Sequence, residues 1–317
     1  MHASLRRLAF LPILAALLGG CAAAPKAPVA IDPRSVAVFD GRTGARVDWN
    51  ALASAAAAAD ALLIGENHGH PLGLPSAAAL FDDVLARSDR AVLALEFFER
   101  HEQADIDDYL GGLIDEPAFR KAAARTPGNY PEAHRAMLEA AKKAKRPVVA
   151  ANAPRRYVRL ARSAGYDRLA SLTPEQRRLF RVPDALPTGR YREDFDKVMA
   201  AAPASHAPTK PGQPAPPEDD AARKARLDAT FRSQSLWDWT MADSVASAMS
   251  SGAPVVLVVG RFHVDHEGGL VQALRALRPG ARVVVLSYID APAPAALPDA
   301  DRGRADFVAY VGPGPQE

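Results

Sequence analysis

The stretch Ala61-Leu-Leu-Ile-Gly-Glu-Asn-His-Gly-His70 joins a short apolar run to three side chains that can do chemistry. An apolar run of about four to eight residues that ends in glycine is typical of a buried strand. Gly65 allows a sharp turn or a close backbone approach at the end of that strand. Because side chains alternate along an extended chain, Glu66, His68 and His70 are expected to project to one side. The stretch therefore predicts a strand that carries a carboxylate and two imidazoles at its tip.

Other apolar runs of strand length follow along the chain, and helical patterns separate them. Strands that alternate with helices favour an α/β fold with a largely parallel sheet. Runs that are apolar throughout indicate that helices cover both faces of the sheet. The predicted strands are 35–39, 61–64, 90–95, 146–151, 254–259, 282–287 and 307–311, and the clearest helical patterns are 49–60, 76–87, 131–145, 221–250 and 270–277.

Polar residues stand at the ends of several of these strands. Glu66 and His68 follow one strand, Glu96 ends a second, Asn152 closes a third and His263 follows a fourth. In open parallel sheets, ligands bind outside the carboxyl ends of the strands. The pattern thus predicts that Glu66, His68, Glu96 and His263 meet in one site at the C-terminal rim of the sheet.

The chemistry of such a site has more than one interpretation. Glutamate and histidine ligands suit a divalent metal such as Zn, Mn or Fe, and a bound metal can activate water for ester or peptide hydrolysis. Alternatively, a histidine activates the water and Glu66 or Glu96 takes its proton. The sequence has no His-Glu-x-x-His helix, Gly-x-Ser-x-Gly elbow or phosphate loop. Spacing alone leaves metal binding, proton transfer and plain hydrogen bonding open.

The N-terminus predicts export and lipidation. Arg6 and Arg7 precede the apolar stretch 8–18, which has the length of a signal-peptide core. The sequence 18–21, Leu-Gly-Gly-Cys, resembles a bacterial lipobox, and Cys21 is the one cysteine of the chain. We expect residues 1–20 to be a signal peptide, Cys21 to be lipidated, and 21–35 to form a flexible tether. The alternative is a plain signal peptide with a coincidental cysteine.

Composition and charge describe an ordinary globular chain of 317 residues, with 48% hydrophobic and 24% charged residues. The whole chain has 39 basic and 37 acidic residues. Residues 1–20 hold two arginines and no acid, so the chain without its signal is formally neutral. This balance gives no indication of a nucleic-acid partner.

Two further segments have unusual composition. Ten arginines lie between Arg155 and Arg192, which indicates either a solvated helical face or a surface for anionic ligands such as carboxylates or lipid head groups. Residues 200–220 are rich in proline and are expected to form a mobile insertion in a single domain that spans 36–312.

Five motifs together resemble the ChaN-type haem-binding lipoproteins of the Tiki and erythromycin-esterase-like superfamily. The similarity runs from about residue 36 to 288. The motifs are Gly65-Glu-Asn-His68, Ala-Leu-Glu96-Phe-Phe, Ala150-Ala-Asn-Ala-Pro-Arg155, Ser235-Leu-Trp-Asp-Trp-Thr-Met-Ala242 and Gly260-Arg-Phe-His263.

The resemblance implies a lipoprotein of the bacterial cell envelope that faces the periplasm, binds haem and serves iron uptake. It also implies a homodimer that holds a cofacial pair of haems. Tyrosine ligation in the family makes Tyr130 a candidate ligand. A further family histidine is replaced here by Leu74, and His70 is the candidate to stand in for it.

The resemblance also makes Arg155 and Arg156 candidates to meet haem propionates, since guanidinium pairs with carboxylate. Superfamily relatives use the residues that match Glu66, His68, Glu96 and His263 as a metal or water-activating centre. A metal-dependent hydrolase is therefore the alternative function, and a lipoprotein with an idle site is a third. Ala22 after the lipidated cysteine, in place of aspartate, favours the outer membrane.

Overall fold

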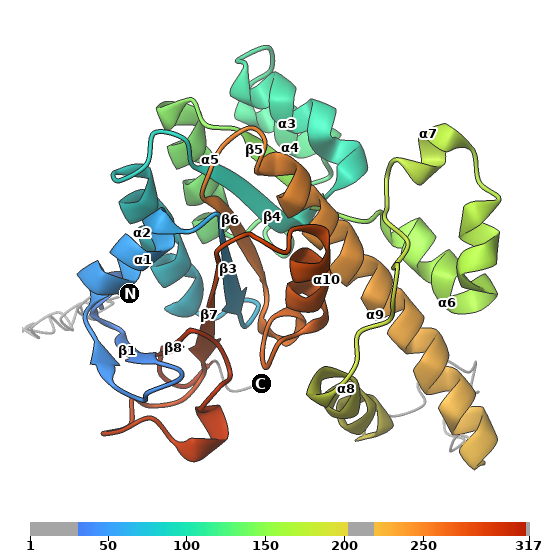
Figure 1. Cartoon of the computed structure of the whole chain (residues 1–317). Coiled ribbons are helices and arrows are strands. Elements are labelled where there is room, and N and C mark those ends of the chain that lie inside the picture. Colours follow the sequence, from blue (N-terminus) through green and yellow to red (C-terminus); the bar gives the residue numbers. More distant parts are fainter. Residues whose placement is uncertain (1–30, 202–218, 315–317) are drawn as a thin grey trace, which may run out of the picture. The chain divides into compact units, whose positions relative to one another are not determined.

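In the residues that the computed structural model describes, 31–201 and 219–314, eight strands form one sheet (Figure 1). The order across the sheet is β2-β1-β8-β7-β3-β6-β4-β5. The strands from β8 to β5 run parallel, whereas β1 is antiparallel to both of its neighbours. The prediction of a largely parallel sheet is thus confirmed. The strands are β1 (Ala37–Asp40), β2 (Arg46–Val47), β3 (Ala61–Glu66), β4 (Val92–Glu99), β5 (Val148–Asn152), β6 (Val255–Gly260), β7 (Val283–Ile289) and β8 (Phe307–Tyr310).

The strand with which the sequence argument began, β3, lies in the interior of the sheet. Its Leu63 pairs with Leu257 of β6 on one side and with Val285 of β7 on the other. Every residue of β3 is buried, including Glu66. A strand with two hydrogen-bonded neighbours and covered faces needs an apolar run, which explains why the run is unbroken.

Helices cover both faces of the sheet, as the apolar strands predicted. The chain contains α1 (Trp49–Ala58), α2 (Gly73–Leu85), α3 (Gln103–Leu110), α4 (Glu116–Ala122), α5 (Glu132–Ala144), α6 (Arg155–Ala170), α7 (Pro174–Arg177), α8 (Arg190–Ala201), α9 (Asp220–Ala248) and α10 (Gly269–Leu277). Short 3-10 turns are η1 (Pro33–Ser35), η2 (Arg100–Glu102), η3 (Arg261–His263) and η4 (Asp299–Asp301).

Alternate residues of each strand pack into different cores. Leu62 of β3 belongs to the core beneath α1, α2 and α5, whereas Leu63 belongs to the core beneath α9 and α10. Figure 1 shows α9 and α10 on one side of the sheet and α1 and α2 on the other. A smaller cluster joins α6 to α9 through Val158 and Leu236. The sheet rim between these layers is where the predicted polar residues emerge.

Local signals in the sequence set several helix ends. Asp48 accepts a hydrogen bond from the backbone N–H of Ala51 at 2.8 Å and so caps α1. Thr173 and Gln176 form a capping box at the start of α7. Gly165 has φ of 77° and interrupts α6, after which the chain turns helical again.

The sequence patterns did not predict β2, α4 or α8. The last residues of the predicted tether are also folded. Pro33–Ser35 form η1, and Arg34 makes an ion pair with Asp83 at 2.9 Å. The hydroxyl of Ser76 donates to the carbonyl of Pro33 at 2.6 Å. These contacts hold the segment on α2, so the folded part begins before residue 36.

The predicted signal peptide, Cys21, most of the tether and most of the proline-rich insertion lie outside the described residues. Among the helices that the structure describes, none has both the length and the apolar character needed to cross a membrane.

Candidate functional site

The four predicted residues come together at the C-terminal rim of the sheet. Nδ1 of His68 lies 2.5 Å from Oε1 of Glu66, and Nε2 of His68 lies 4.0 Å from Oε2 of Glu96. Nε2 of His263 lies 3.6 Å from Oε1 of Glu96. Glu96 thus stands between two imidazoles, each supplied by a different strand end. The parallel order of β3, β6 and β4 produces this meeting.

Glycines allow the close backbone approach on which the site depends. A Cβ on Gly65 would lie 2.6 Å from Cγ2 of Val264 and 2.9 Å from Cα of Arg261. The backbone N–H of Gly260 donates to Oε2 of Glu96 at 2.7 Å. The turn that carries His263 can therefore pack directly on the end of β3.

Glu66 and His68 form a pair with unequal exposure. Glu66 is 1% exposed, and its Oε2 has no hydrogen-bond partner in the described part of the chain. Burial raises the pKa of Glu66. The hydrogen bond from His68 to Glu66 raises the pKa of the imidazole. The side chain of His68 is 53% exposed, so its other ring nitrogen can meet a ligand.

A second carboxylate, Asp238 of α9, orients His263. Oδ1 of Asp238 lies 2.5 Å from Nδ1 of His263, and the hydroxyl of Tyr191 donates to Oδ2 at 2.7 Å. Burial raises the pKa of Asp238. Burial alone would lower the pKa of His263, but the charge of Asp238 and its hydrogen bond raise it. His263 is therefore held between carboxylates on both of its ring nitrogens.

Asp238 and Tyr191 were not predicted as site residues, although signals for both are present. Asp238 lies within the Ser235–Ala242 motif that carried part of the family resemblance. Tyr191 lies on α8, where Tyr191, Phe195 and Val198 recur at the spacing of one helical face. Charged residues fill many of the other positions of α8, so its apolar spacing is hard to recognise in the sequence.

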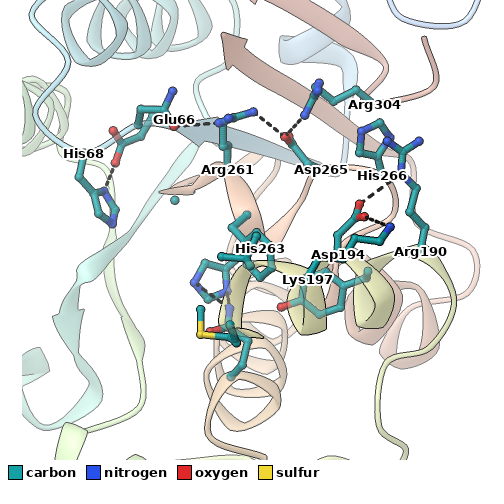
Figure 2. Close-up of a pocket in the computed structure, with 17 residues that line it drawn as sticks. Glu66, His68, Arg190, Asp194, Lys197, Arg261, His263, Asp265, His266 and Arg304 are labelled. Carbon is teal, nitrogen blue, oxygen red and sulfur yellow. Dashed lines mark hydrogen bonds and ion pairs between the residues drawn. The ribbon is translucent and has the colours of Figure 1, made fainter. Parts of the chain in front are cut away.

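A cavity of about 670 Å³ opens beside Glu66, His68 and His263 (Figure 2). One wall is apolar and includes Val198, Met199 and Phe262. The cavity is also lined by Arg190, Lys197, Arg261, Arg304, His266, Asp194 and Asp265.

The polar wall of this cavity carries more cations than carboxylates. Arg190 and Lys197 each pair with Asp194 at 3.2 Å. Arg261 and Arg304 share Asp265, at 3.1 and 2.6 Å. Arg304 also pairs with Asp301 at 2.6 Å. The lining of the cavity has these four cations and three carboxylates, Glu66, Asp194 and Asp265, and the excess of cations favours an anionic group in the cavity.

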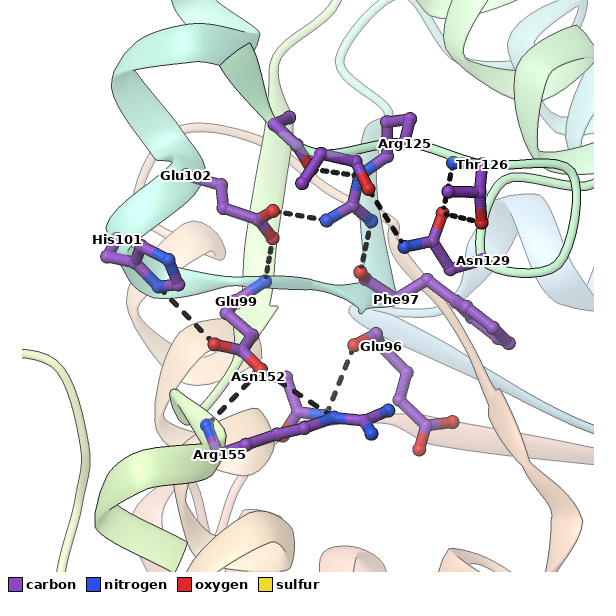
Figure 3. Close-up of polar contacts among 12 residues, drawn as sticks. Glu96, Phe97, Glu99, His101, Glu102, Arg125, Thr126, Asn129, Asn152 and Arg155 are labelled. Atoms are coloured by element: carbon purple, nitrogen blue, oxygen red, sulfur yellow. Dashed lines mark hydrogen bonds and ion pairs between the residues drawn. The ribbon is translucent and has the colours of Figure 1, made fainter. Parts of the chain in front are cut away.

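His68 also lines a second cavity, of about 450 Å³. Figure 3 shows polar contacts among residues of this region, including Glu96, Glu99, Asn152 and Arg155. The cavity is lined by His68, Glu96, Asn152 and Arg155, among others. The amide of Asn152 donates to the backbone carbonyl of Glu96 at 3.1 Å. Nε of Arg155 lies 3.8 Å from Oε1 of Glu99. Arg155 is thus near the site, as the sequence suggested.

Two of the residues assigned to haem from the sequence, Arg156 and Tyr130, line neither cavity. Arg156 lies over the ring of Tyr157 at 4.7 Å and lines neither of the two cavities. Tyr130 is 4% exposed and packs against Phe98 and Phe119, so its hydroxyl points into the core. Burial raises the pKa of Tyr130. This placement contradicts a ligand role for Tyr130 in either cavity.

His70 is a structural residue in this fold. Its Nδ1 accepts the backbone N–H groups of Leu72 and Gly73 at 3.1 and 2.9 Å, which caps the start of α2. Its Nε2 lies 3.2 Å from the carbonyl of Gly312. The chain leaves the extended conformation at Asn67, so His70 does not share a side with Glu66 and His68. His70 lines neither of the two cavities.

The described residues contain no group of three or more His, Cys, Asp or Glu side chains arranged to hold a metal ion. The site as it stands consists of two carboxylate–imidazole pairs, Glu66–His68 and Asp238–His263, with Glu96 between them. Such an arrangement can orient imidazoles, hold protons and present nitrogen donors to a ligand.

The fold and site define a class of α/β domain with histidine–carboxylate pairs at the rim of a mixed sheet. The sequence profile described as haem-binding uptake, Tiki superfamily, ChaN matches residues 52–274. This match covers most of the chain, and the chain belongs to the ChaN family. The resemblance found from the five motifs is thereby confirmed. Curated proteins yielded no significant match.

One solved structure supports the fold. A structure of ChaN of Campylobacter jejuni, described as showing cofacial haem binding, is 15% identical with a TM-score of 0.63. The alignment covers 86% of this chain and 96% of that one. A mutant of the erythromycin esterase EreC in its open conformation is 12% identical, with a TM-score of 0.44 over 87% of this chain and 83% of that one. The type III effector HopBA1 is 15% identical, with a TM-score of 0.41 over 89% and 99%.

Proposed function

We propose that this chain binds haem in the 670 Å³ cavity and acts as a lipoprotein of the bacterial cell envelope in haem or iron acquisition. The observation that carries the proposal is the cavity itself. It combines the apolar wall of Val198, Met199 and Phe262 with cations such as Arg190 and Lys197. A planar apolar ring with two carboxylates needs this combination of surfaces.

The residues present fit a haem group in their donor chemistry as well. Haem iron supplies an open coordination position that accepts a lone pair from an imidazole or a comparable donor. His68, His263 and His266 all line the cavity. Arg190 and Lys197 are 55% and 72% exposed, and each retains N–H donors beyond the bond to Asp194. These donors can hold the propionates.

Titration with haemin tests the proposal. Purified protein is expected to shift the Soret band at micromolar haemin and to saturate at a fixed stoichiometry. A ratio of one haem per subunit in a haem-dependent dimer would support the cofacial arrangement that the family implies. Absence of a shift at micromolar haemin would sink the proposal.

The envelope part of the proposal rests on the sequence before residue 31. The apolar stretch 8–18 followed by Cys21 supports a lipid anchor. Ala22 supports the outer membrane over the inner one. The formally neutral chain and the anionic-ligand cavity suit a periplasm-facing protein that handles a small carboxylate-bearing ligand.

A water-activating hydrolase for an ester or peptide bond is the second candidate. The observation that favours it is Glu96, which lies within 4.0 Å of His68 and 3.6 Å of His263. The buried Glu66 also lines the cavity, and within the described residues its Oε2 has no hydrogen-bond partner. In this reading a histidine orients a water and Glu96 or Glu66 takes its proton.

Glu96→Gln discriminates between the two candidates. It should abolish hydrolysis of a chromogenic ester while haem binding is retained. Wild-type protein without esterase or peptidase activity would remove this candidate. Metal analysis of protein purified without chelator tests whether Zn, Mn or Fe takes part.

A further inference from the structure

The loop after η3 has a backbone conformation that its side chains do not favour. His266 and Glu267 are consecutive residues with φ of 52° and 57°, in the left-handed region where non-glycine residues are uncommon. The backbone N–H of His266 donates to the carbonyl of Arg304 at 2.7 Å, which fixes the turn. Strain of this kind at a cavity is a reason to look for a function of the side chain it orients.

The imidazole of His266 lines the 670 Å³ cavity on the wall that also carries Arg190 and Arg304 (Figure 2). Within residues 31–201 and 219–314, no hydrogen bond to either of its ring nitrogens is found. The ring is half-buried, so it is neither fully solvated nor tied to the protein. A partly desolvated imidazole without a partner is available to a ligand in the cavity.

The other two histidines of the cavity are committed to carboxylates. Nδ1 of His68 is bonded to Glu66, and Nδ1 of His263 is bonded to Asp238. The second ring nitrogen of each histidine lies toward another carboxylate, Glu96, at 4.0 Å from Nε2 of His68 and 3.6 Å from Nε2 of His263. Both rings are therefore placed between carboxylates, whereas His266 is not.

The charged groups that act most strongly on His266 are the cations Arg304 and Arg190. Burial lowers its pKa, and the nearby Arg304 and Arg190 lower it further, while the more weakly acting Asp265 and Asp194 oppose them. The neutral ring therefore retains a lone pair at neutral pH, which is the form that binds metal.

We propose that His266 coordinates the iron of a haem bound in this cavity, with the propionates toward Arg190 and Lys197. The inference rests on the proposed haem function, and it assigns the donor of that function to a residue that neither the motifs nor the family resemblance singled out.

The left-handed backbone supplies an unusually clean variant. His266→Gly removes the ring and at the same time suits φ of 52°, so the fold is expected to be at least as stable. Glu267→Gly is the matched control, because it relieves the same kind of strain at φ of 57° and leaves the imidazole in place. The side chain of Glu267 pairs with Arg275 at 3.1 Å and does not line this cavity.

The readout is the ligation signature of the ferric haem complex, by Soret position and electron paramagnetic resonance, after titration with haemin. Wild type and Glu267→Gly should share one signature. His266→Gly should lose it, and added imidazole should restore it. Circular dichroism and a thermal melt of each protein without haemin show that the variants are folded.

The possible outcomes distinguish a failure of this inference from a failure of the proposed haem function. If wild type binds haemin and His266→Gly keeps the wild-type signature, His266 is not the donor, and the haem function stands. If His68→Ala instead loses the signature, the donor lies at the carboxylate-paired histidine and the inference is overturned. If wild type fails to bind haemin, both fail together.

Discussion

His134 is a buried imidazole that no neighbour satisfies. It is 0% exposed, and within the described chain neither ring nitrogen has a hydrogen-bond partner. Its ring packs on Phe97 with centroids 4.6 Å apart, and Phe97 packs in turn on His68 at 5.0 Å. Burial lowers the pKa of His134 from 6.5 to about 4, with a smaller contribution from His68.

This depressed pKa predicts that the fold weakens in mild acid. Between pH 6.5 and 4 the unfolded chain binds a proton at His134 that the native chain does not, so the free energy of unfolding falls as pH falls. The loss between pH 8 and pH 5 should be about 2 kcal/mol. His134→Leu should remove that part of the slope in urea unfolding at the two pH values. An unchanged slope would show that the native imidazole is protonated more easily than its burial indicates.

Gly65 lies near the end of β3, where the sequence predicted a close backbone approach, and it packs tightly against the turn that carries His263. An added Cβ would meet Cα of Arg261 at 2.9 Å and the side chain of Val264 at 2.6 Å. Gly65→Ala should therefore cost about 1–3 kcal/mol and displace the turn that carries His263. Gly280→Ala, where a Cβ would meet nothing within 4 Å, is the matched control and should change stability by less than about 0.5 kcal/mol. Equal melting temperatures would show that η3 can move away.

At the scale of the element, two helices offer cations to the propionates of the proposed haem. Arg190 and Lys197 of α8 line the larger cavity, whereas Arg155 at the start of α6 lines the smaller cavity. Arg190→Glu should therefore weaken haemin binding more than Arg155→Glu, and more at low salt than at high salt. Arg156→Glu, on a side chain that lines neither cavity, is the control. A larger loss from Arg155→Glu would move the propionates to the α6 side.

The elements also show where sequence patterns were sufficient. Apolar runs predicted β3, β4, β5, β6 and β7. Both faces of a strand in a covered parallel sheet are buried, so its sequence is apolar throughout. Local signals also match the interruption of α6 at Gly165 and the start of α7 at the capping box. In contrast, α8 was not predicted, because its apolar positions are few and charged residues lie between them.

At the scale of the whole molecule, the residue proposed to carry the lipid anchor precedes the folded unit in the sequence. The unit from Asp32 onward has the cores and cavities, and Cys21 lies before it. Cys21→Ser should therefore move the protein from the membrane pellet to the soluble periplasmic fraction, with haemin binding unchanged. Fractionation of cells that express each form measures this. A variant that still pellets would contradict the lipobox assignment.

The sequence by itself determined the α/β class, the largely parallel sheet and the rim at which Glu66, His68, Glu96 and His263 meet. It could do so because strand patterns and strand-end residues are local, and because parallel strands bring their carboxyl ends to one edge. Only the tertiary structure decided which carboxylate holds each imidazole, that Tyr130 is in the core, and that the ring of His266 has no hydrogen-bond partner among the described residues. Those features depend on contacts between α9, α8 and the loop after η3, and residues far apart in the chain leave no spacing from which such contacts can be read.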